Sequence, residues 1–144
     1  MGESGQHLVP RLVNTIVTDE SCLTVETAGI ALGVQGEDGL TELVPLTRHG
    51  SFVVRFAAYL GFEAAGSSAR WVVPTLVRCL QLEWAPLNVD TILSALGKIG
   101  GPDALRCLAS IAWDRRIDQE TRRNCASALR EAASSAPGLP NDDD

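Results

Sequence analysis

The sequence predicts an all-α protein, and three features of its pattern support this fold class. Apolar residues recur at spacings of three and four along most of the chain, which is the period of an amphipathic helix. No segment alternates apolar and polar residues over the length of a strand. Aromatic residues make up only 5% of the 144 residues, so we expect a core of Leu, Val, Ile and Ala, as in closely packed helical layers.

The stretch from Val89 to Trp113 gives the strongest local signal, because it predicts two helices joined by a sharp turn. Gly100 and Gly101 end the first helix, since glycine adopts the left-handed C′ conformation without a steric penalty. Pro102 then suits the first position of the second helix, where its missing N–H has no partner within the helix. Leu96 lies on the apolar stripe beside the turn, and we expect it to be fully buried.

The remaining helices are expected on the same periodicity, over residues 7–17, 23–32, 40–48, 52–64, 70–82 and 119–133. Residues 33–39 contain three glycines and two acidic residues and are expected to form a loop. We expect residues 1–6 to be disordered, residues 7–135 to form one repeat domain, and residues 136–144 to form a flexible acidic tail.

Two kinds of helix alternate along the chain, as expected for a repeat protein. One kind is rich in small residues and carries a repeated Leu-Gly step, at Ala31-Leu32-Gly33, Tyr59-Leu60-Gly61 and Ala95-Leu96-Gly97. The other kind starts near a Val-Pro step, at Val9-Pro10, Val44-Pro45 and Val73-Pro74.

This pattern resembles the HEAT repeat, and most closely its short bacterial form, the PBS-lyase HEAT-like repeat. The best match runs from Ala95 to Gly100 and continues through Pro102 to Leu105. The resemblance implies a right-handed α-solenoid of about 3.5 helical hairpins, whose contacts are between neighbouring repeats. Proteins of this family are mostly scaffolds that bind other proteins, and a minority bind chromophores or DNA.

Charge and composition indicate which classes of binding partner and which cellular compartment to expect. The net charge of −6 argues against strong non-specific binding of nucleic acid. No apolar run approaches the ~20 residues of a membrane span, and no secretory signal is visible, so we expect a cytoplasmic, bacterial protein without membrane contact. The four cysteines show no spacing typical of a metal site, and we expect them to be small buried hydrophobes in a reducing compartment.

Signatures of enzymes are absent from the sequence. It contains no G-x-S-x-G, H-E-x-x-H, P-loop or G-x-G-x-x-G motif, so we predict no catalytic residue, no metal, no cofactor and no enzyme activity. The alternative is an accessory lyase or a DNA-glycosylase-like enzyme, since glycosylase relatives of HEAT proteins combine Trp, Asp and Arg. Trp113, Asp114 and Arg115 are consecutive here, so their side chains diverge, and we expect Trp113 to close the core instead.

The function expected from the resemblance is a protein–protein interaction module, acting as a scaffold, adaptor or inhibitory partner through its inner face. Arg78 and Arg106 share an Arg-Cys-Leu motif on the second kind of helix, and Arg11 lies on a helix of the same kind. We predict that these three arginines and Trp113 bind a protein partner through an acidic or extended segment. The alternative for the arginines is a solvated stripe without a binding role.

Overall fold

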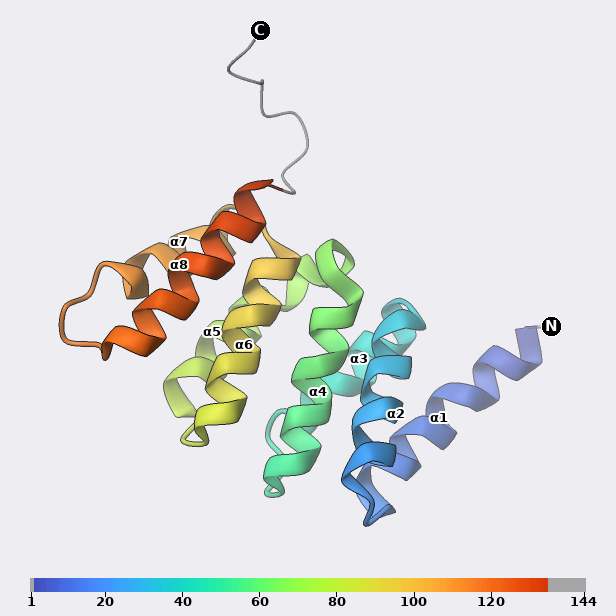
Figure 1. Ribbon diagram of the computed structural model, residues 1–144. Coiled ribbons are helices and arrows are strands. Elements are labelled where there is room, and N and C mark those ends of the chain that lie inside the picture. Colours follow the sequence, from blue (N-terminus) through green and yellow to red (C-terminus); the bar gives the residue numbers. More distant parts are fainter. Residues whose placement is uncertain (1, 135–144) are drawn as a thin grey trace, which may run out of the picture.

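The structure is a stack of helices arranged in two layers, which confirms the all-α solenoid predicted from the sequence (Figure 1). A computed structural model describes residues 2–134, with side chains from residue 8 onward. Within this range the chain forms no β-strand, and its elements are α1 (Gly2–Thr18), α2 (Cys22–Val34), α3 (Glu37–Leu46), α4 (Phe52–Ala65), the 3₁₀ helix η1 (Gly66–Val72), α5 (Val73–Leu82), α6 (Pro86–Ile99), α7 (Pro102–Ala112) and α8 (Gln119–Ser134).

Helices α2, α4, α6 and α8 form one layer, in which neighbouring helices pack directly side by side (Figure 1). Glycine makes this approach possible. A Cβ atom on Gly33 would collide with the carbonyl oxygen of Gly61, and one on Gly97 would press against Ala128. The Leu-Gly step is therefore a packing motif, in which glycine removes the side chain where two helix backbones meet.

Helices α1, α3, α5 and α7 form the second layer, which is packed less tightly. Helices α5 and α7 touch each other only slightly, whereas α4 and α6 in the first layer are in extensive contact. Hollows lie between α5 and its neighbours.

The loop expected over residues 33–39 is shorter than predicted. Helix α2 continues to Val34 and α3 begins at Glu37, so only Gln35 and Gly36 separate them. Gly36 takes the positive φ of 86° that the turn needs. Gly33 lies inside α2, where the absence of a side chain allows the backbone of α4 to approach closely. From the sequence it was interpreted as a helix breaker, but its role is in helix packing.

The turn predicted between the helices of the 89–113 stretch is confirmed. Helix α6 ends at Ile99, Gly100 and Gly101 have φ values of 69° and 88°, and Pro102 opens α7. Both glycines thus take a conformation that other residues rarely adopt.

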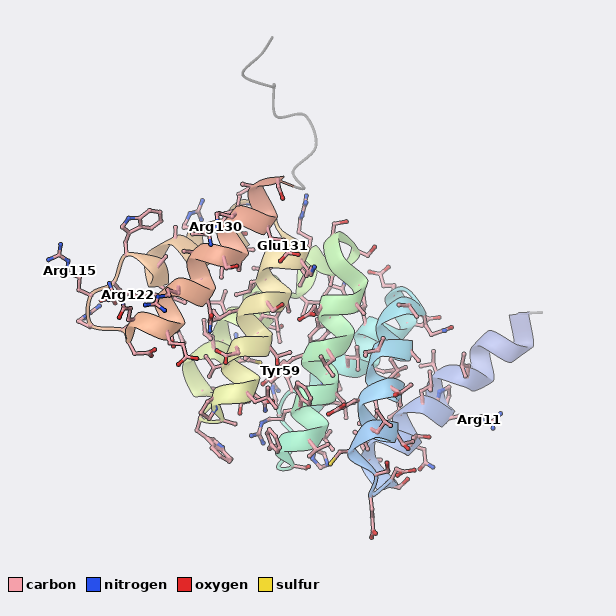
Figure 2. All side chains as sticks on the ribbon, viewed as in Figure 1. Arg11, Tyr59, Arg115, Arg122, Arg130 and Glu131 are labelled. Atoms are coloured by element: carbon pink, nitrogen blue, oxygen red, sulfur yellow. The ribbon has the colours of Figure 1, made fainter. Side chains whose placement is uncertain are left out.

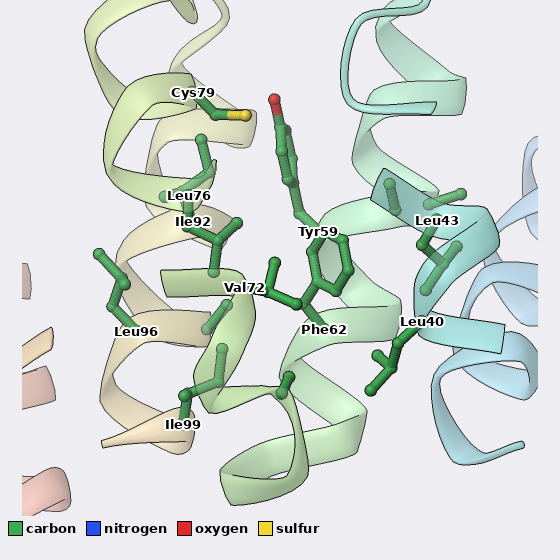
Figure 3. Packing of buried hydrophobic residues seen from close by; sticks show 14 of the residues in the cluster. Leu40, Leu43, Tyr59, Phe62, Val72, Leu76, Cys79, Ile92, Leu96 and Ile99 are labelled. Atoms are coloured by element: carbon green, nitrogen blue, oxygen red, sulfur yellow. The ribbon is translucent and has the colours of Figure 1, made fainter. Parts of the chain in front are cut away.

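One apolar core runs through the stack, and the expected burial of Leu96 is confirmed, since it is 0% exposed. Figure 3 shows Leu96 and Ile92 of α6 beside Leu76 of α5, with Phe62 of α4 on the other side of the cluster. None of the described helices is both long and apolar enough to span a bilayer.

Further predictions concerned the ends of the chain and the cysteines. Residues 1–6 were expected to be disordered, whereas α1 begins at Gly2 in the structure. The tail predicted at 136–144 lies outside the described residues. Cys79 and Cys125 are buried as expected, whereas Cys22 is exposed because it opens α2.

The close packing of α2 on α4 predicts the effect of one added methyl group. Gly33→Ala should lower the free energy of unfolding by about 1–3 kcal/mol, because the new Cβ forces the two backbones apart. Gly50→Ala is the matched control, since a Cβ there meets nothing within 4 Å and its φ is not positive. Urea unfolding measures both. A Gly33→Ala protein as stable as the wild type would contradict the close contact.

Candidate functional site

Arg55 and Glu83 form a buried ion pair between α4 and the turn that follows α5. Arg55 Nε donates to Glu83 Oε2 at 3.0 Å and Arg55 Nη2 donates to Glu83 Oε1 at 3.0 Å, so the pair is bidentate. The side chains are only 11% and 2% exposed, respectively. Because the two residues are 28 positions apart, the pair links consecutive repeats.

The remaining contacts of Arg55 connect two turns of the chain. Its Nη1 donates to the carbonyl oxygens of His49 at 3.0 Å and Gly50 at 3.1 Å, in the turn between α3 and α4. Its guanidinium carbon also lies 5.7 Å from the ring centroid of Trp84, within the range of a cation–π contact. Arg55 therefore fixes the α3–α4 turn against the α5–α6 turn.

Tyr59 completes the buried network. Its hydroxyl donates to Glu83 Oε2 at 2.8 Å, and Figure 3 shows that hydroxyl beside the thiol of Cys79. Burial and the hydrogen bond to Glu83 raise the pKa of Tyr59 above its ordinary value. Burial acts to raise the pKa of Glu83 as well, but the hydrogen bonds from Arg55 and Tyr59 outweigh it, so the pKa of Glu83 is lowered. At neutral pH the carboxylate is charged and the phenol is neutral.

A hollow of about 330 Å³ opens over this network, and we call it the turn hollow. The network forms its floor, the α3–α4 turn forms one wall, and α5 with the α5–α6 turn forms the other. Arg48 and Arg78 line it and are both exposed. Leu82 and Trp84 supply apolar surface at its edge and are 75% and 76% exposed.

His49 is the histidine that lines the turn hollow. Its Nδ1 accepts a hydrogen bond from the backbone N–H of Ser51 at 3.0 Å. The neutral imidazole therefore carries its proton on Nε2, which can donate a hydrogen bond to a ligand.

The three arginines predicted to bind a protein partner lie in separate places. Arg78 lines the turn hollow, whereas Arg106 lines a second hollow of about 620 Å³ between α5 and α7 and donates to Asp103 at 3.1 Å. Arg11 is exposed on α1, and Figure 2 shows it at the opposite end of the stack from Arg115. Of the predicted set, only Arg78 belongs to the turn hollow.

Trp113 does not close the core, so this expectation was wrong. It is 76% exposed and follows the end of α7, where no later helix covers it. The neighbouring carboxylate of Asp114 accepts from Arg116 Nε at 3.0 Å and Nη2 at 2.9 Å. These bonds lower the pKa of Asp114 to about 2. Asp114 therefore pairs with Arg116 at the surface, and Trp113, Asp114 and Arg115 form no converging site.

Sequence reasoning missed the buried network. Arg55 and Tyr59 are four residues apart, so they share one face of α4, and their neighbours in sequence are apolar. A charged residue on the buried face of a helix requires a partner, and the sequence contained this signal. The sequence did not identify Glu83 as the partner, because it lies 28 residues further along the chain.

Among the side chains of residues 8–134, no three His, Cys, Asp or Glu residues gather in a way that could hold a metal ion. The whole chain contains two histidines.

Comparison with known proteins gives one informative similarity. No protein family and no curated protein matches the sequence. Among solved structures, the chain is similar to human deoxyhypusine hydroxylase in complex with glycerol, with a TM-score of 0.70 and 25% sequence identity. The match covers 88% of this chain and 44% of that chain, so this protein spans less than half of the hydroxylase.

This similarity corrects the predicted function. The sequence was interpreted as a scaffold or adaptor without enzyme activity, but the helical-repeat protein that it matches is an enzyme. The alternative of an accessory enzyme on a helical-repeat fold agrees better with this finding. The coarser resemblance, to an all-helical repeat protein, is confirmed.

The buried ion pair predicts a large loss of stability when its charge is removed. Glu83→Gln keeps the shape of the side chain but leaves Arg55 without a counter-charge, so it should cost about 3–5 kcal/mol in urea unfolding. Asp103→Asn is the matched control, because its partner Arg106 is exposed and the loss should be barely measurable. Equal, small losses in the two variants would contradict the buried pair.

The lowered pKa of Glu83 also predicts the direction of a pH effect. A carboxylate with a depressed folded pKa stabilises the protein above its unfolded pKa, and this contribution is lost as the pH falls through the folded pKa. Wild-type stability should therefore decline below about pH 4.5, the ordinary value for Glu, more steeply than that of Glu83→Gln. Parallel curves for the two proteins in acid titrations of unfolding would contradict this assignment.

Proposed function

We propose that this chain is the substrate-binding part of an enzyme, and that its substrate binds in the turn hollow. The observation that carries the proposal is the buried Arg55–Glu83–Tyr59 network beneath an accessible hollow that also contains His49. Enzymes place binding groups on turns that a rigid scaffold positions, and here the ion pair makes two turns rigid.

The similarity to an enzyme supports the functional class, and the size of the hollow supports the ligand class. At about 330 Å³ the turn hollow is at the lower end of the range for small-molecule sites, so a small metabolite fits better than a polymer. Its walls come from two consecutive repeats, so the hollow requires the stacked fold.

His49 is the residue to which we assign hydrogen-bond donation to the substrate. It lines the hollow, its Nδ1 accepts from Ser51, and its Nε2–H is left to face a ligand. In this tautomer Nε2 has no lone pair that could accept a proton, so the neutral ring acts as a donor that polarises an oxygen of the ligand.

The oxidation step of the hydroxylase is not assigned to this chain. Insertion of oxygen into a C–H bond needs an activated oxygen species, which oxygenases generate with a redox metal or an organic cofactor. The described residues offer no ligand set for such a metal. We therefore assign to the chain the binding of a substrate and its polarisation by hydrogen bonds.

Filling the turn hollow provides the direct test. Thr75 is a half-buried residue of its wall, so Thr75→Phe should abolish the stabilisation that metabolites give to the wild type in thermal unfolding. Ser110→Phe fills the larger hollow between α5 and α7 and is the matched control. Ligands that stabilise Thr75→Phe as well as the wild type would show that the site lies elsewhere.

Removing the imidazole separates catalysis from binding. His49→Asn retains an acceptor near the position of Nδ1 for Ser51, but it lacks the Nε2 group. We expect turnover of metabolite mixtures, followed by mass spectrometry, to fall by about 100-fold or more while binding by the arginines is retained, because one hydrogen-bond donor to the reacting oxygen is lost. A variant as active as the wild type would exclude His49 as a catalytic hydrogen-bond donor.

A further inference from the structure

From the hydrogen-bonding groups of the turn hollow we infer that its ligand is a small organic anion, held by Arg48 and Arg78. This inference rests on the proposed function, because it specifies the substrate class of the same site. It depends on which groups in the hollow remain available to a ligand and which are already occupied by the protein.

The charged and imidazole groups that remain available are donors. Arg48 and Arg78 line the hollow, and neither forms an ion pair with any described carboxylate. His49 has its acceptor nitrogen occupied by Ser51 and presents a donor. A guanidinium has five N–H groups and no acceptor, so the two arginines require acceptors from the ligand.

The acceptors of the hollow, by contrast, are saturated. Glu83 is the only carboxylate that lines it, and its two oxygens accept from Arg55, from Tyr59 and, at 3.4 Å, from the backbone of Ala85. The carbonyl oxygen of His49 accepts from Arg55 as well. A cationic ligand would therefore find two arginines and no free carboxylate, and its binding would be unfavourable.

The second hollow shows that the excess of unpaired donors is a property of the turn hollow and not of the Arg-Cys-Leu motif itself. Arg106 lines it and shares the Arg-Cys-Leu motif of Arg78, but Asp103 lies in the same hollow and accepts from Arg106. In the turn hollow the equivalent arginine has no such partner among the described residues. The same motif is thus neutralised within the protein in one hollow and left for a ligand in the other.

The apolar edge indicates that the anion has an organic part. Leu82 and Trp84 are about three-quarters exposed at the rim, where they can cover an aromatic or branched group. A planar carboxylate is a suitable acceptor for guanidinium groups, which can bind it through two parallel hydrogen bonds. The chain as a whole is acidic, so this positive hollow is the local feature that attracts an anion.

Probes of similar shape and different charge test the inference with the full-length protein. Benzoate, benzamide and benzylamine share one ring and differ in charge. Isovalerate and isovaleramide form a second, branched pair, and phenyl phosphate adds an anion of another chemical class. Isothermal titration calorimetry should show the anions binding about tenfold or more tightly than the amides, and the amine should not bind up to about 10 mM. Raising NaCl from about 0.05 to 0.5 M should weaken the binding of the anions only.

Arginine variants test whether the anion binds at Arg48 and Arg78. Arg48→Gln combined with Arg78→Gln should weaken anion binding by about 10- to 100-fold, the cost of losing charge-assisted hydrogen bonds. Arg106→Gln should leave it unchanged. Circular dichroism and thermal unfolding verify that the double variant folds, and both arginines are exposed, so we expect it to fold.

The outcomes distinguish failure of the ligand class from failure of the site. Binding of benzylamine or of the amides as tight as benzoate, abolished by Thr75→Phe, would overturn the anion and leave the substrate site in place. Anion binding that Thr75→Phe does not affect would overturn both. Anion binding equal in the wild type and the double arginine variant, or no binding by any anion of the series, would also overturn the inference.

Discussion

The close approach of helix backbones in the α2–α4–α6–α8 layer is the constraint on which the rest of the structure depends. Gly33 and Gly97 have no side chain at the contact, so the helices of this layer pack almost backbone to backbone. The helices of the opposite layer contact one another much less. Tight packing on one side of the stack is thus accompanied by looser packing on the other, and both hollows lined by arginine lie along α5 in that second layer.

The Arg55–Glu83 pair relates this packing to the site. The free energy needed to remove two charges from water offsets much of the favourable energy of their attraction. A buried ion pair is therefore weak evidence for added stability. Its clearer effect is geometric. It holds the α3–α4 turn against the α5–α6 turn, and thereby fixes the positions from which His49 and Trp84 face the hollow. The positioning of the site is thus determined by an interaction between consecutive repeats.

Local patterns made most of the fold predictable, and long-range contacts account for what was not. The periodicity and the Gly100–Gly101–Pro102 turn predicted the last helices to within a few residues. Gly33 was interpreted as part of a loop because a sequence does not show that another backbone packs against that position. Arg78 was singled out from its motif and lines the turn hollow, but its neighbours Arg48 and Glu83 come from other turns, and no local pattern brings them together.

A shared fold assigns no chemistry by itself, since helical repeats support many functions, so the argument for an enzyme must rest on the site. Arg48 belongs to one turn and Arg78 to the helix of the next repeat, and they line the same hollow only when the two repeats stack in register. The glycine contacts set that register, and the buried ion pair holds it at the level of the turns. The docking faces of repeat proteins also extend over several stacked repeats, so dependence on stacking does not distinguish a docking face from a small-molecule site. The small volume of the hollow, about 330 Å³, is what supports the proposed small-molecule site over an extended docking face.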